Sequence, residues 1–151
     1  MKYNKSFGGE PFENYKRYLE TIQDKLPKPL YDFVSDSKRH DLGEQSLHDT
    51  WVNEIEVKVI RDKENRYREK VSIIKVELLG SYHDRTFNLN FNDVTSYQLG
   101  VGKFGHCDLI TYEIYCESED DHNILTFNAA FADESVIIIK AGEITITEKF
   151  L

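Results

Sequence analysis

A strict alternation of apolar and charged residues follows the only tryptophan, Trp51, and constrains the fold more than any other feature. The apolar set is Ile55, Val57 and Val59, and the charged set is Glu54, Glu56 and Lys58. A period of two places one set on a core and the other in water, as in a half-buried strand of an antiparallel sheet. We therefore expect a strand to begin near Trp51.

Similar patterns continue to the end of the chain. The expected strands are Trp51–Ile60, Lys70–Leu79, Thr86–Asn92, Leu109–Cys116, Asn123–Phe131, Val136–Ile139 and Ile144–Thr147, with a turn at Ala141-Gly142. Most connections are too short for helical crossovers, so we expect about seven strands in a mostly antiparallel meander. The sheet face away from the core is expected to be wet, or to bind carbohydrate, peptide or protein. Its residues would be Glu54, Glu56, Lys58, Asn88, Asn90, Thr111, Glu113, Asn128 and Thr145.

The helical pattern lies near the N-terminus. Between Pro11 and Pro27, apolar residues recur at spacings of three and four from Phe12 to Leu26, which predicts one amphipathic helix. A second short helical turn is expected over Leu30–Val34. The fold class is therefore α+β: an N-terminal helix packed on the sheet, within a single domain that comprises a helical segment 1–35 and a sheet 51–150. The polar connector 36–45 is where we expect a segment that folds over a site.

Charge and cysteine content limit the partners and the compartment. The 151 residues include 19 basic and 27 acidic ones, which gives a net charge of −8. Nucleic acids and anionic membranes attract positive fields, so neither is expected as a partner, whereas a basic protein is. Solubility alone would also explain the acidic surface. With no long apolar run, a polar start at Met1–Lys5 and only two cysteines, Cys107 and Cys116, we expect a cytoplasmic protein.

Each histidine has an acidic neighbour, as in His48-Asp49 and His83-Asp84. These residue types bind divalent metals, but adjacent residues on a strand point to opposite faces, so convergence requires turns. Two interpretations stay open. The His48-Asp49 pair either fixes the turn that enters the first strand, or forms a ligand or metal site with His83 and His106 in a cleft there.

Other candidate chemistry is weaker. Cys107 next to His106 lacks a helix N-terminus that would lower the pKa of its thiol. The glycines at 100, 102 and 105 match a dinucleotide-binding string, but no βα context surrounds them, so they are interpreted as a loop that needs positive φ. We expect no catalytic residue and no cofactor.

The run from Ser46 to Val52 (Ser-Leu-His-Asp-Thr-Trp-Val), together with Phe91-Asn92-Asp93-Val94, resembles a pattern in small uncharacterised bacterial β-rich proteins. Their Leu-His-Asp turn opens a sheet domain, and some are similar to immunity proteins, which neutralise a toxin. The resemblance implies no catalytic residue. It implies stoichiometric occlusion, with acidic residues that steer a basic toxin and aromatic residues that anchor it. No aromatic cluster is obvious, although Tyr82, Tyr97 and Phe104 in loops are candidates.

Together these patterns predict a non-enzymatic protein-binding domain, and the resemblance implies an immunity-type inhibitor of a bacterial toxin. The expected protein-binding residues are Glu117, Glu119, Asp120, Asp121 and Phe104. The alternative is a small-ligand-binding or metal-binding protein, or a hydrolase, with its site near His48 and Asp49. The oligomeric state stays open.

Overall fold

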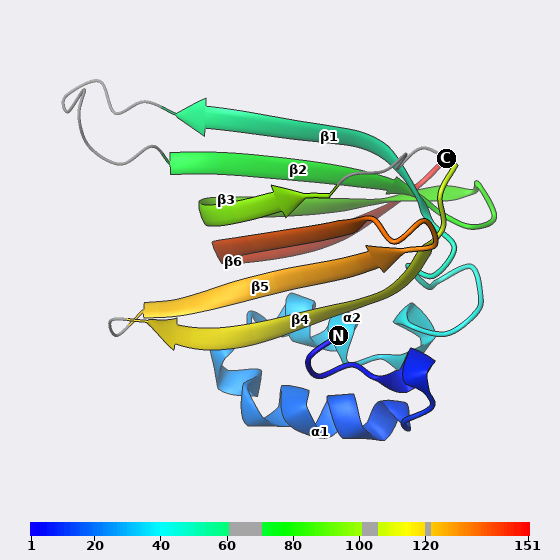
Figure 1. The fold of residues 1–151 in the computed structure, drawn as a ribbon, viewed down its shortest axis with the longest axis horizontal. Coiled ribbons are helices and arrows are strands. Elements are labelled where there is room, and N and C mark those ends of the chain that lie inside the picture. Colours follow the sequence, from blue (N-terminus) through cyan, green and yellow to red (C-terminus); the bar gives the residue numbers. More distant parts are fainter. Residues whose placement is uncertain (61–70, 101–105, 120–121) are drawn as a thin grey trace.

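The computed structural model describes residues 1–60, 71–100, 106–119 and 122–151, which form an α+β fold (Figure 1). The helices are α1 (Phe12–Thr21) and α2 (Lys28–Val34), and the strands are β1 (Trp51–Ile60), β2 (Val71–Leu79), β3 (Arg85–Leu99), β4 (Leu109–Glu119), β5 (His122–Phe131) and β6 (Val136–Phe150). All strand pairs are antiparallel. The predicted α+β class and the antiparallel sheet are therefore confirmed, whereas the single helix, the strand count and the simple meander are not.

The predicted helix is divided. α1 ends at Thr21, whose hydroxyl donates to the carbonyl of Tyr18 (2.6 Å), and a 3-10 turn follows at Gln23–Lys25. Such side-chain bonds compete with helix continuation. Pro29 lies in the first turn of α2, where its missing N–H has no cost. In the described part of the chain, no helix is long and apolar enough to cross a membrane.

The strand order is β1-β2-β3-β6-β5-β4, which is two three-stranded meanders rather than one. They join where β3 pairs with β6, the two longest strands, at 15 residues each. The link from β3 to β4 therefore crosses to the opposite edge of the sheet.

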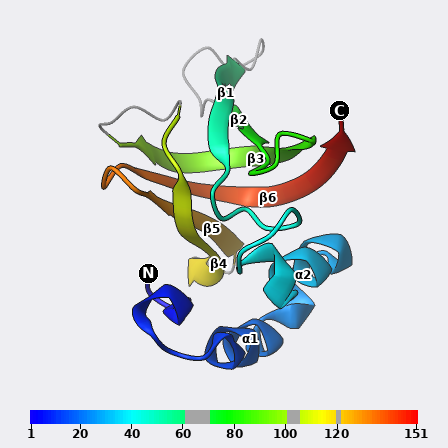
Figure 2. The ribbon, with the colours of Figure 1, turned by 90° about the vertical axis from the view of Figure 1, so that its right-hand side faces the viewer.

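The described residues form six strands, because the two last predicted strands are one. Ala141 and Gly142 do not turn the chain, and Ala141 lies opposite both Val94 and Leu125. An added Cβ at Gly142 would lie 3.1 Å from the Cβ of Asp93, so the small residue lets β6 pass close to β3. Figure 2 shows β6 bending strongly along its length.

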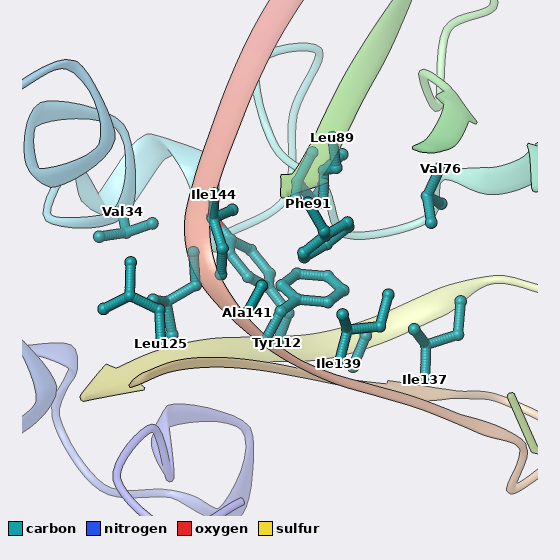
Figure 3. Packing of buried hydrophobic residues seen from close by; sticks show 14 of the residues in the cluster. Val34, Val76, Leu89, Phe91, Tyr112, Leu125, Ile137, Ile139, Ala141 and Ile144 are labelled. Atoms are coloured by element: carbon teal, nitrogen blue, oxygen red, sulfur yellow. The ribbon is translucent and has the colours of Figure 1, made fainter. Parts of the chain in front are cut away.

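The sheet curls until its two edge strands touch at one end. Asp49 N–H donates to the carbonyl of Leu109 (2.8 Å), and Leu109 N–H donates to that of Thr50 (3.0 Å). The curled sheet and the helices share one interior, part of which Figure 3 shows. Its members come from both meanders and from α2, and include Val34, Val76, Leu89, Phe91, Tyr112, Leu125, Ile137, Ile139 and Ile144.

The sheet face that was predicted to be solvent-exposed is exposed along β1, but one of its predicted residues, Glu113, is not. Glu113 is completely buried. Its carboxylate accepts backbone hydrogen bonds from Lys2 (2.7 Å), Tyr3 (2.7 Å) and Asn4 (2.9 Å). The N-terminal segment thus returns to cover this position, and the expectation for Glu113 was wrong.

The glycine string was also misinterpreted at its described member. Gly100 does not have positive φ, while Gly102 and Gly105 lie outside the described residues. A Cβ at Gly100 would lie 2.7 Å from the nitrogen of Val136 and 2.8 Å from its oxygen. Close approach of two backbones, not a turn conformation, therefore requires glycine here.

Candidate functional site: a cleft at Trp51

A cleft of about 380 Å³ opens at the end of the sheet where β1 begins. Four segments that are distant in the sequence meet there: the connector at 42–43, the entry to β1, the β2–β3 turn and the entry to β4. The residues that line it are Leu42, Gly43, Asp49, Trp51, Ser81, Tyr82, His83 and Asp108. The β1–β4 contact brings Asp49 and Asp108, 59 positions apart, to one site.

Trp51 holds a fixed orientation at the centre of this group. Its indole N–H donates to Oδ1 of Asp108 at 2.7 Å. The imidazole of His83 meets the indole edge-on at 4.9 Å between centroids, and that of His106 lies 4.8 Å away in a tilted arrangement. Two imidazoles and one carboxylate therefore set the position of the ring.

Three residues around the cleft adopt positive φ, which only glycine adopts without cost. The angles are 63° at Asp49, 56° at His83 and 60° at His106. Each such residue costs on the order of 1–3 kcal/mol and persists only where its surroundings enforce it, commonly at ligand sites. Backbone bonds enforce two of them: Asp49 to Leu109 (2.8 Å), and His83 to the carbonyl of Gly80 (2.8 Å).

His48 lies behind Asp49 and does not line the cleft. Its ring is buried and stacks on Phe7, with 4.6 Å between centroids. Its Nδ1 is 2.9 Å from a carboxylate oxygen of Asp49, but without the alignment of a hydrogen bond, and its Nε2 has no hydrogen-bond partner among the described residues. His48 therefore supports Asp49 from the protein side.

The chemistry of the cleft is acidic and aromatic. It presents the carboxylates of Asp49 and Asp108 beside the rings of Trp51 and Tyr82, and Tyr82 is 66% exposed. Among the described lining residues none is Lys or Arg. A cation over an indole face gains about 0.5–2 kcal/mol, and a nearby carboxylate adds to the attraction. The arrangement suits a positively charged group with a flat or apolar stem.

The four residues predicted as a ligand or metal site are only partly brought together. Asp49 and His83 line the cleft, His106 contacts its tryptophan, and His48 is set back. Within the described ranges, no group of three or more His, Cys, Asp or Glu side chains is placed to hold a metal ion. Burial raises the pKa of the Cys107 thiol, which makes that residue a poor nucleophile.

Of the predicted protein-binding residues, only Glu117 has a described side chain, and it does not line the cleft. Glu117 is paired with Lys2 (3.2 Å) and Lys140 (3.7 Å), so its charge is already compensated. Asp120, Asp121 and Phe104 lie outside the described residues, as does the side chain of Glu119.

Sequence reasoning gave Trp51 a structural role and did not single out Asp108. The sequence did contain a sign of the cleft: His48-Asp49, His83-Asp84 and His106-Cys107-Asp108 each lie in a turn next to a strand. No protein-family model matches the chain, and none of the curated proteins matches it.

Proposed function

We propose that the protein acts by binding a basic protein, and that a lysine or arginine side chain of the partner enters the cleft at Trp51. The observation that carries this proposal is the convergence of Trp51 and Tyr82 with the carboxylates of Asp49 and Asp108 in one cleft. Tryptophan and tyrosine are enriched among the residues that contribute most to protein–protein binding.

Two further properties of the chain support the proposal. The net charge of −8 attracts a basic surface over a long range and speeds encounter. The cleft is also preorganised, because Trp51 is hydrogen-bonded to Asp108 and a backbone hydrogen bond holds Asp49. The conformational entropy lost on binding is therefore small.

The partner proposed is a bacterial toxin with a basic surface, and the mechanism is stoichiometric occlusion without catalysis. The toxin rests on the resemblance of Ser46–Val52 to immunity-like proteins, while the basic surface rests on the charge and the cleft. In this proposal the protein is cytoplasmic, in keeping with the free thiols of Cys107 and Cys116.

The single tryptophan provides a direct test of the cleft. A short blocked peptide with one arginine is titrated while the fluorescence of Trp51 is recorded, and the same peptide with citrulline serves as the neutral control of equal shape. We expect saturable binding of the arginine peptide with a dissociation constant of about 1–10 mM. An equal response to both peptides would refute a cation site.

A matched pair of variants locates the effect. Asp49→Asn keeps the shape and tolerates positive φ, and should weaken arginine-peptide binding about fivefold, as for loss of one charge pair. Asp24→Asn removes the same charge from an exposed turn between the helices and should leave binding unchanged. The same variants test the protein partner: less of the neighbouring gene's product should co-purify with Asp49→Asn than with the wild type, and an equal amount should co-purify with Asp24→Asn.

A further inference from the structure

The two edges of the sheet are treated differently. The outer edge of β4 is covered by side chains from the N-terminal region: Asn4 Nδ2 donates to the carbonyl of Tyr112 (2.8 Å). The hydroxyl of Tyr15 donates to the carbonyl of Ile114 and accepts from its N–H, both at 2.7 Å. The hydroxyl of Tyr18 accepts from the N–H of Cys116 (3.0 Å). Backbone groups that would otherwise template another strand are thus occupied.

Within the part of the chain that the structure describes, the edge formed by β1 has no such cover. Among the described residues, the backbone of 54–60 has no hydrogen-bond partner other than its ladder with β2. Because alternate residues of a strand direct their N–H and C=O outward, this stretch presents a row of unpaired groups. A bulge interrupts the β1–β2 register only between Val52 and Glu54, so the strand is regular beyond it.

The side chains of this stretch are incompletely buried on its core face. Val57 is 39% exposed and Val59 is 50% exposed, although both belong to the apolar set of the strand. The opposite face carries the exposed charges of Glu54, Glu56 and Lys58. An added strand would therefore satisfy backbone groups and cover valine surface together.

We propose that β1 pairs antiparallel with β1 of a second copy, about a two-fold axis at Val57, so that the two sheets join into one. In this register Glu56 of each copy faces Lys58 of the other, Val59 faces Ile55, and the two Val57 side chains meet. Directly opposed opposite charges stabilise a strand pair, while like charges destabilise it.

Charge complementarity selects this register among its neighbours. An axis at Glu56 would oppose the two Glu56 carboxylates, and an axis at Lys58 would oppose the two ammonium groups. Axes at Glu56 and Lys58 are the nearest alternatives, because two opposed residues must both be even-numbered or both odd-numbered for their side chains to lie on the same face of the joined sheet. Only the axis at Val57 pairs Glu56 and Lys58 on both sides, which favours a second copy as the occupant of this edge.

The proposed dimer contact does not use the residues that line the binding cleft. Trp51 is six positions before Val57, which is about 20 Å along an extended strand, and it lies outside the paired stretch 54–60. The inference is thus independent of the proposed function. Its interface is small, so association is expected to be reversible.

Sedimentation equilibrium tests the proposal with two reciprocal charge reversals. The wild-type protein should show a monomer–dimer equilibrium at concentrations up to about 500 µM. Glu56→Lys and Lys58→Glu should each weaken dimerisation about tenfold or more, because each places two like-charged pairs across the axis. Mixing the two variants should restore dimers, since the two lysines of one chain then face the two glutamates of the other.

Glu20→Lys reverses one charge on the exposed side of α1 and is the matched control, which should dimerise like the wild type. Melting curves verify that each variant is folded. A wild-type protein that stays monomeric over this range would overturn the proposal. So would single variants that dimerise as well as the wild type, or a mixture that does no better than its components; these results would mean that another surface, or another protein's strand, is involved.

Discussion

Acidification is expected to destabilise this protein through one buried imidazole, that of His40. The ring stacks on Tyr112 at 4.4 Å and 8°, and Phe12 and Tyr15 complete an aromatic enclosure around it. Both nitrogens are used by the neutral form. Nδ1 accepts from the Asn4 amide (3.2 Å), and Nε2–H donates to the carbonyl of Val34 (2.8 Å). A proton on Nδ1 would place the N–H of the imidazole against the N–H of the Asn4 amide, so this hydrogen bond would be lost.

Burial lowers the pKa of His40 to about 4, and the carbonyl of Val34 only partly offsets that effect. The unfolded chain titrates near 6.5, so as the pH falls it takes up the proton before the folded protein does. The stability contribution is therefore complete above pH 6.5 and is lost as the pH falls from 6.5 to 4. From these two pKa values the loss is about 2 kcal/mol at pH 5 and about 3 kcal/mol below pH 4.

The assay is urea unfolding at pH 7.5 and pH 5.0 for the wild type and for His40→Gln, which keeps a neutral donor and acceptor but does not titrate. The variant should be less stable at pH 7.5, because it loses the stacked ring. Between the two pH values the wild type should lose about 2 kcal/mol more than the variant, since carboxylate effects common to both cancel. Equal losses in the two proteins would refute the reasoning, as would a ring resonance of His40 that titrates near 6.5.

Two further predictions concern buried backbone contacts. Glu113→Gln should lower the free energy of unfolding by about 2–3 kcal/mol in urea titrations, because an amide cannot accept from all three N–H groups of residues 2–4 that the carboxylate binds. If the N–H groups of residues 2–4 exchange with solvent no faster in the variant than in the wild type, this reasoning is contradicted. Gly100→Ala should cost about 1–3 kcal/mol, because its Cβ meets the backbone of Val136, whereas Gly8→Ala meets nothing within 4 Å and should leave the melting temperature unchanged.

The sequence was sufficient for features that depend on local periodicity. The alternation at residues 54–59 predicted β1 because each side chain reports its own face of the strand, and the spacing from Phe12 to Leu19 predicted α1 in the same way. Ala141-Gly142 misled the prediction because small residues serve both turns and close strand packing. Only the approach of Asp93, on another strand, distinguishes the two.

The parts that could not be predicted depend on long-range contacts. Glu113 alternates with the apolar residues Tyr112 and Ile114, so the pattern predicts a solvent-exposed side chain at this position. The first residues of the chain nevertheless cover it. Asp108 gives no local sign that it binds the indole of Trp51, 57 positions away. In both cases the partner is distant in the sequence, and a period of two does not encode which distant segment will contact a strand.

The curl also explains why the two proposed surfaces lie on the same strand. Backbone bonds join Asp49 and Thr50, just before β1, to Leu109, the first residue of β4, and these bonds bring the segments before both strands together at the cleft. Beyond Thr50 no described backbone hydrogen bond links the two edges, and Figure 1 shows β1 and β4 on opposite sides of the sheet. β4 is covered by the tyrosines of α1, whereas no described helix bonds to β1, so residues 54–60 keep backbone groups that no other described residue pairs. In the two proposals, the start of β1 contributes to a site for a partner's side chain, and the stretch 54–60 pairs with a strand of a second copy.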